Sequence, residues 1–434
     1  MKTAPRSSSS SLASTLAEIF VWAILIITPF LFVPAKESFR LPKLLVAEWL
    51  AMASLLCLAW NLRNSGAGGA GLRDVWRLPA VRAVLPALLV ATAGILTTAH
   101  PLRVRESLFD FWIGAACLIG WSAGLERERQ ERLLRGLIWP AGGLAFVGIL
   151  QFYRLWEPLR FTGIDYDVRL GVTSFAGNPG DLSSYLVLPC LIALWSFPGL
   201  RPGPWRWLAG AALALCLYGL AITQTLASLA AVAAGAAVFA LLRLPRRKVL
   251  IGMGAAAVAA VVLVAAVGPL RVRVLNKVGQ LAGGDLNQVL TGRLDGWRAA
   301  LWMLREQPLT GVGHGAYLPE YIPAKLELLD RGVEFLPGHT NPVFSNAHNE
   351  LLQVGAEWGI PGLLALAWGL WVVIRTAARK QWDPGNRALA WSGLTALALL
   401  SLAYFPFHVA LVSFPALLFL AWVLRPEPQG DQPE

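Results

Sequence analysis

The sequence predicts an all-α integral membrane protein with about twelve transmembrane helices. Three observations indicate this class. Of the 434 residues, 56% are hydrophobic and only 15% are charged, whereas a soluble globular chain carries about 25% charged residues. Apolar segments of the ~20 residues that a helix needs to cross a bilayer recur along most of the chain. Basic residues gather in alternate short loops, as they do in polytopic membrane proteins.

Each apolar segment is expected to be an α-helix, because a spanning segment must satisfy its own backbone hydrogen bonds. The segments lie at residues 16–33, 41–60, 80–98, 106–124, 136–155, 181–197, 205–222, 226–242, 249–267, 351–374, 388–404 and 407–424. The predicted regions are a disordered tail at 1–15, a nine-helix transmembrane region at 16–267, a long loop at 268–348, three C-terminal transmembrane helices at 349–424 and a tail at 425–434.

The distribution of charge predicts the orientation. A net charge of +11 could indicate a nucleic-acid partner, but the basic residues concentrate in alternate short loops, which favours membrane lipids instead. Short cytoplasmic loops are the ones enriched in arginine and lysine. We therefore expect an inner-membrane-type protein with both termini in the cytoplasm. The 268–348 loop then lies on the outer side of the membrane.

This loop holds three of the five histidines of the chain and is the expected place of function. It is predicted to contain short helices. One apolar stripe follows helical spacing and ends before Pro308, which predicts an amphipathic helix on the outer face of the bundle. The stripe consists of Leu290, Leu294, Trp297, Leu301 and Leu304.

His348 is the first candidate site residue. It lies in the stretch SNAHNELLQVGAEWGIPG, where polar residues give way to a new span. Ser345 or Asn346 can cap that helix, which places His348 in its first turn. The positive end of a helix disfavours a charged imidazole, so the ring is expected to be neutral and able to accept a proton. The alternative is an interfacial histidine that fills a cap.

Arg293 and Arg169 are the candidate cations. Arg293 lies one position off the apolar stripe, so its side chain can reach past the helix edge. Arginine is suited to hold a phosphate by two hydrogen bonds, although near a membrane it often binds lipid headgroups. Arg169 precedes the Asn178-Pro179-Gly180 turn, and a cation beside free N–H groups at a helix start can bind an anion. Solvation of the loop is the alternative for Arg169.

No metal and no cofactor are expected. The spacing of His314, His339 and His348 fits no helical or zinc-type pattern. The glycines of GVGHGAY lack the βαβ context of a dinucleotide fingerprint. Ionisable residues within spans are functional candidates by default. The acids in or at the ends of spans are Glu48, Asp110 and Asp181.

Three blocks resemble the O-antigen ligase/polymerase superfamily. They read RLGVTSFAGNPGDLSSYL, TGRLDGWRAALWMLREQPLTGVGHGAY and NAHNELLQVGAEWGIPGLL, within residues 169–365. Members of the family are polytopic glycosyltransferases with a large periplasmic loop near the C-terminus. The three blocks form a fairly specific set when taken together, and none is specific alone.

The resemblance implies transfer of a glycan from a polyprenyl-diphosphate donor to a glycolipid or glycan acceptor, on the periplasmic face of a bacterial inner membrane. By this resemblance Arg293 holds the donor diphosphate and His348 is the base on the acceptor hydroxyl. Arg169 and Asn178 match the block ahead of the sixth span and are expected to bind substrate. An O-antigen ligase that uses undecaprenyl diphosphate and lipid A-core, without a metal and with inversion, is the expected member.

Alternatives remain within and outside the family. A polysaccharide polymerase or a protein O-oligosaccharyltransferase differs only in its acceptor, and a transporter of lipid-linked sugars is the main alternative of another class. The family often carries an arginine where this chain has Leu226. Either Arg169, Arg271 or Arg273 replaces it, or the donor differs, or activity is lost. The oligomeric state is left open.

Overall fold

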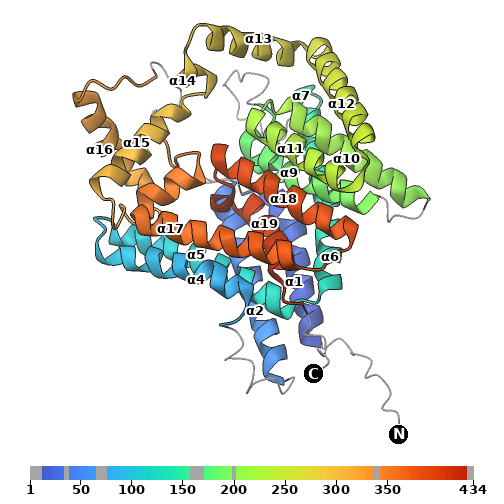
Figure 1. Ribbon diagram of the computed structural model, residues 1–434, viewed down its shortest axis with the longest axis horizontal. Helices are drawn as coiled ribbons and strands as arrows, with labels where there is room; N and C mark the ends of the chain where they lie inside the picture. The colour runs from blue at the N-terminus through green and yellow to red at the C-terminus, as the bar shows by residue number, and fades with distance from the viewer. Residues whose placement is uncertain are drawn as a thin grey trace.

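The computed structural model describes residues 12–33, 39–64, 76–156, 171–197, 202–336 and 343–427. Within these ranges the chain folds into helices and forms no strand, which confirms the all-α membrane class. Most of the predicted tails, at 1–11 and 428–434, lie outside the described residues. Figure 1 shows the helices gathered into one bundle, with α19 near its middle.

Nine helices of the described ranges are long and apolar enough to cross a membrane, so the expected number of twelve is not confirmed. They are α1 (Leu12–Phe30), α2 (Arg40–Asn64), α4 with η1 (Pro79–Leu96), α5 (Pro101–Gly124), α6 with α7 (Arg127–Phe152), α10 (Pro204–Ile222), α11 (Leu226–Arg243), α12 (Arg246–Ala266) and α17 (Glu350–Arg379). The other three predicted spans coincide with helices that are shorter or less apolar. These are α9 (Pro179–Ser196), α18 (Pro384–Ala403) and α19 (Ala410–Leu424).

Burial explains the places of the central and outer helices. A helix that is apolar on every side belongs inside a bundle or in lipid. Almost all of α9 and α19 is buried, and α19 packs against α1, α2, α5 and α9. The equally apolar α12 lies at the edge of the bundle in Figure 1 and is exposed along most of its length. It therefore has the surface of a helix that faces lipid.

The described part of the predicted 268–348 loop contains four helices: α13 (Gly268–Ala282), α14 (Leu286–Val289), α15 (Arg293–Glu306) and α16 (Tyr317–Asp330). A helix is therefore present at the predicted apolar stripe, but it begins after the first residue of that stripe. Leu290 precedes the helix, and Leu301 is 52% exposed. The buried side chains of α15 are instead Asp295, Gly296, Ala299, Ala300 and Met303. Small residues let α15 approach its neighbours closely, and most of the large apolar side chains of the stripe are only partly buried.

A break in α17 joins this loop to the membrane bundle. Gly359 adopts φ 66° and ψ −160°, and Pro361 has no N–H to donate to the Glu357 carbonyl one turn earlier. The Gly311–Gly315 loop supplies the missing donor. The N–H of Gly313 donates to the Glu357 oxygen at 2.9 Å, and that of Val312 donates to the Ala356 oxygen at 3.0 Å. The glycine-rich GVGHGAY segment therefore connects the loop helices to the broken turn of α17.

Candidate active site

The candidate site forms where several helix ends meet on one side of the bundle. It combines the starts of α2, α9 and α15 with the segment before α17 and the turn between α18 and α19. Figure 1 shows α15 and the start of α17 lying beside each other on this side. The site is therefore assembled from segments spread over most of the chain.

Asp181 is the buried anchor of the site. It lies in the first turn of α9 and is 1% exposed. Nε and Nη2 of Arg40 donate to its two carboxylate oxygens at 2.9 and 3.0 Å, and the Tyr404 hydroxyl donates to Oδ1. The two-bond contact fixes the plane of the guanidinium group. The Arg40 side chain remains 40% exposed, so one edge of this fixed cation can still meet a ligand.

Phe405 brings Arg40 and His348 to a common surface. The Arg40 guanidinium lies over the Phe405 ring at 5.4 Å, and the His348 ring is 4.7 Å from the same ring in an edge-on arrangement. Tyr404 stacks on Phe405 at 4.4 Å and lies 6.3 Å from His348. An aromatic pair from the α18–α19 turn thus positions both a cation and an imidazole.

Arg293 reaches the same region from the loop helices. It is the first residue of α15 and is partly buried. Burial lowers the pKa of its guanidinium, the Tyr404 hydroxyl opposes this shift, and the charge of Arg273 adds to it. The charges of Arg40 and Arg293 both act on Tyr404. Three guanidinium groups are therefore near enough to influence one another directly or through Tyr404, and an anion between them would relieve their repulsion.

The backbone of His348 corrects one expectation. Neither Ser345 nor Asn346 caps α17, because Asn349 does: its Oδ1 accepts the N–H of Leu352 at 3.1 Å. His348 therefore precedes the helix instead of lying in its first turn. It adopts φ 54°, a region that residues other than glycine rarely occupy and that occurs often at functional sites.

Two contacts of the α17 start hold this segment against the α18–α19 turn. Asn349 Nδ2 donates to the Leu402 carbonyl at 3.0 Å. Glu350 Oε1 accepts the N–H of Phe407 at 3.1 Å and lies 3.4 Å from Nδ1 of His408. Burial lowers the pKa of His408, but the Glu350 carboxylate raises it more, to about 9. The His408–Glu350 ion pair thus fixes His348 relative to Phe405.

The α15 start and the His348 segment are also in contact. A Cβ atom on Gly296 would lie 3.6 Å from the Ala347 carbonyl oxygen and 3.6 Å from Cγ of Phe344. Gly296 is one turn after Arg293, so both residues are on the same side of α15. This close approach brings the Arg293 end of α15 to the chain that carries His348.

Asn178 and Arg169 are the other two residues that were predicted to bind substrate. Asn178 caps α9, since its Oδ1 accepts the N–H of Asp181 at 2.8 Å. In this way it holds Asp181 in place, and a substrate contact stays a prediction. Arg169 lies outside the described residues.

The described residues contain no group of three or more histidine, cysteine or acidic side chains that could hold a metal ion. His314, one of the three loop histidines, is buried in a structural contact. Its Nδ1 lies 3.2 Å from Glu357 Oε2 and accepts the indole N–H of Trp358 at 3.2 Å. His339 lies outside the described ranges.

Sequence reasoning did not identify Arg40, Tyr404 and Phe405 as site residues. Arg40 is the first residue of α2 and is typical of the basic residues that flank spans. Tyr404 is the last residue of the predicted span 388–404, and Phe405 lies in the short gap before the next span. Asp181 was identified from the sequence as an acid at the end of a span, and this feature did point to a residue of the site. Charged residues at span ends become informative only once the fold shows which ends meet.

The fold and the site define a polytopic helical membrane protein with arginines and a histidine gathered at one end of its bundle. The O-antigen ligase family model matches residues 211–367, which include Arg293 and His348. This match supports membership of the O-antigen ligase/polymerase superfamily, as the sequence blocks predicted, and an O-antigen ligase/polymerase type of membrane enzyme. Comparison with curated proteins gives no match.

Proposed function

We propose that this protein transfers a glycan from undecaprenyl diphosphate to an acceptor hydroxyl of lipid A-core at the periplasmic face of the inner membrane. The observation that carries the proposal is the convergence of Arg293 and Arg40 with His348 around Tyr404 and Phe405. Arginines suit a diphosphate, and a histidine suits removal of a proton from a hydroxyl.

Each residue has a defined role in the proposed reaction. His348 takes the proton of the acceptor hydroxyl, and the acceptor oxygen attacks the anomeric carbon. The bond from that carbon to the diphosphate oxygen breaks, and its electron pair leaves with undecaprenyl diphosphate. Arg293 and Arg40 stabilise the negative charge that gathers on the leaving diphosphate, which is a task that fixed guanidinium groups perform without a metal. Attack opposite to the leaving group inverts the anomeric centre.

Arg40 supplies a cation at the end of the bundle where the family often has an arginine and this chain has Leu226. Leu226 is the first residue of α11, and Ser228, two residues later, hydrogen bonds to Ser183 of α9 at 3.0 Å. Ser183 is two residues from Asp181, the partner of Arg40. Arg40 therefore brings a cation from α2 to the end of the bundle where α11 lacks one. None of the replacements named from the sequence was Arg40, although Arg273 does lie close to Arg293.

The test is transfer by the purified protein in detergent with EDTA, using an undecaprenyl-diphosphate glycan and lipid A-core. We expect His348→Ala to lower the rate by ~10²–10⁴-fold and Arg293→Ala by ~10²–10³-fold. Arg298→Ala is the matched control on the same helix, because its side chain donates to the Glu334 carbonyl. It should leave the rate within a few-fold of wild type. Equal activity in all four proteins would refute the site.

The role of Arg40 has its own comparison. Arg40→Gln should slow transfer, and Leu226→Arg in the same chain should restore part of the loss, because it returns a cation to the same end of the bundle. No loss in Arg40→Gln would exclude Arg40 from the reaction.

Transfer to a growing polysaccharide or to a protein, but not to lipid A-core, would identify a polymerase or a protein O-oligosaccharyltransferase. Donor movement across a vesicle membrane without transfer would indicate a transporter.

A further inference from the structure

A groove lies at the opposite end of the bundle from the candidate active site. A groove of about 820 Å³ opens between the C-terminal end of α11 and the α17–α18 connection. The candidate active site is at the other ends of these helices, next to Leu226, His348 and Tyr404. The 20 residues of α18 span ~30 Å at 1.5 Å per residue. The groove is therefore about one bilayer core away from the proposed chemistry and takes no part in it.

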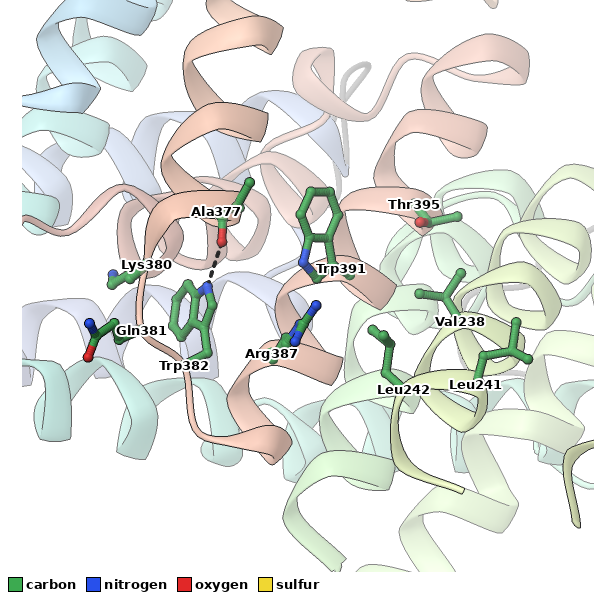
Figure 2. Close-up of a pocket in the computed structure, with 11 residues that line it drawn as sticks. Val238, Leu241, Leu242, Ala377, Lys380, Gln381, Trp382, Arg387, Trp391 and Thr395 are labelled. Atoms are coloured by element: carbon green, nitrogen blue, oxygen red, sulfur yellow. Dashed lines mark hydrogen bonds between the residues drawn. The ribbon is translucent and has the colours of Figure 1, made fainter. Parts of the chain in front are cut away.

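Two donors converge in this groove. Figure 2 shows the Arg387 side chain directed toward Trp391, with the indole nitrogen of Trp391 on the side facing Arg387. In the part of the chain that the structure describes, neither side chain has a hydrogen-bond or ion-pair partner. By contrast, the neighbouring Trp382 already donates to the Ala377 carbonyl at 2.8 Å. An arginine fork and an adjacent N–H group are thus available to one anion.

The surroundings favour an anion further. Lys380 donates to the carbonyl oxygens of Trp422, Val423 and Arg425 at 3.0–3.3 Å. The Glu427 carboxylate, which accepts the Gln381 N–H at 2.9 Å, acts on the charge of Lys380 in the opposite direction to burial. Burial lowers the pKa of Lys380 to about 8, and the charge of Arg127 acts in the same direction. The charged side chains that line the groove, Lys380 and Arg387, are both basic, so a bound phosphate would meet two cations there.

The opposite wall is apolar. Val238, Leu241 and Leu242 of α11 line it, and Leu241 is 58% exposed. A free inorganic anion would gain nothing from these side chains, whereas an acyl chain would bury them. The volume lies within the ~300–1,000 Å³ of small-molecule sites, which is enough for a headgroup and the first part of its chains.

We propose that this groove binds an anionic phospholipid, whose phosphate contacts Arg387 and Trp391 and whose acyl chain lies along the Val238–Leu242 wall of α11. Basic pockets between membrane helices recognise anionic lipids in this way. Basic residues commonly flank transmembrane helices without binding a particular lipid. Arg387 differs from these because a second donor and an apolar wall share its groove.

The test measures the melting temperature of the full-length protein in detergent as three probes are titrated. The probes are phosphatidylglycerol, phosphatidylcholine with the same acyl chains, and inorganic phosphate. We expect phosphatidylglycerol to raise the melting temperature, and its apparent affinity to fall about tenfold in Arg387→Gln. Trp391→Phe, which keeps a ring but loses the N–H group, should weaken binding less.

Arg375→Gln is the matched control, because Arg375 is also exposed on this half of the bundle but lies over the Trp371 ring at 4.7 Å. It should bind phosphatidylglycerol like wild type, and Arg387→Lys should keep part of the affinity. An equal response to phosphatidylcholine would overturn the proposal, as would unchanged affinity in Arg387→Gln. An equal effect of inorganic phosphate would show a free-anion site in place of a lipid site.

Discussion

Replacing Gly311 by alanine should destabilise the protein several times more than replacing Gly332. Both glycines have positive φ, 61° and 79°, and an L-residue in this region costs ~1–2 kcal/mol. A Cβ atom on Gly332 meets nothing within 4 Å, whereas one on Gly311 would lie 2.3 Å from the Glu357 carbonyl carbon and 2.5 Å from the Trp358 nitrogen. These are backbone atoms, so no side-chain rotation can relieve the overlap.

The overlap sets the size of the effect. To admit the methyl group, the Gly311 loop must move away from α17, and this movement loosens the hydrogen bonds from Val312 and Gly313 to the Ala356 and Glu357 carbonyls. Each net bond is worth ~0.5–1.5 kcal/mol, and overpacking adds ~1–3 kcal/mol. We therefore expect a loss of ~3–8 kcal/mol in Gly311→Ala and only ~1–2 kcal/mol in Gly332→Ala.

Thermal unfolding of the two variants in the same detergent and at the same heating rate measures the difference. Fixed conditions matter because membrane proteins often unfold irreversibly, so that the melting temperature depends on rate. Gly311→Ala should melt well below Gly332→Ala. Equal melting temperatures would refute the reasoning, because they would mean that the loop does not press on the broken turn of α17.

Two further predictions concern the segment that carries His348. The pKa of His408 is raised from 6.5 to about 9 by Glu350 against the effect of burial, so its stabilisation is complete below pH 6.5 and is lost as the pH rises through about 9. The melting temperature of His408→Gln should thus fall below that of wild type at pH 6, by an amount that shrinks at pH 10; a gap independent of pH would contradict the ion pair. Asn349→Ala removes the cap on the Leu352 N–H and the bond to the Leu402 carbonyl, so it should cost ~1–2 kcal/mol and slow transfer, whereas full activity would show that the cap does not position His348.

The sequence predicted the fold class because composition and segment length depend only on the bilayer. Each of the twelve apolar segments coincides with a helix. The number of membrane-spanning helices was harder to predict from the sequence. Helices α9 and α19 are apolar but are buried among other helices, so their apolar residues do not by themselves indicate a span. The residues that α15 buries could not be predicted from its apolar stripe, because Gly296 and its small neighbours pack closely and periodicity counts only large apolar residues.

The site could be predicted only where a residue matched a local pattern. Arg293 and His348 stand in recognisable blocks, and they do come to one end of the bundle. Arg40 is 141 positions from Asp181, and Tyr404 is 223 positions from it. Such pairings are set by which helix ends meet, and no spacing in the sequence encodes them. The cap of α17 was misplaced because Ser345, Asn346 and Asn349 are all competent caps, and tertiary contacts such as that of Asn349 with Leu402 favour the last.

The arrangement of the cations links the connector to the proposed chemistry. Arg273 and Arg293 belong to α13 and α15 of the loop, whereas Arg40 belongs to the N-terminal helices. The charges therefore gather only when the loop is seated on the bundle. The Gly311–Gly315 connector and the Gly296 contact provide that seating, because both involve backbone atoms at close range. A donor diphosphate that bridges the two sets of arginines would in turn hold the loop in place, so donor binding and loop seating should stabilise each other.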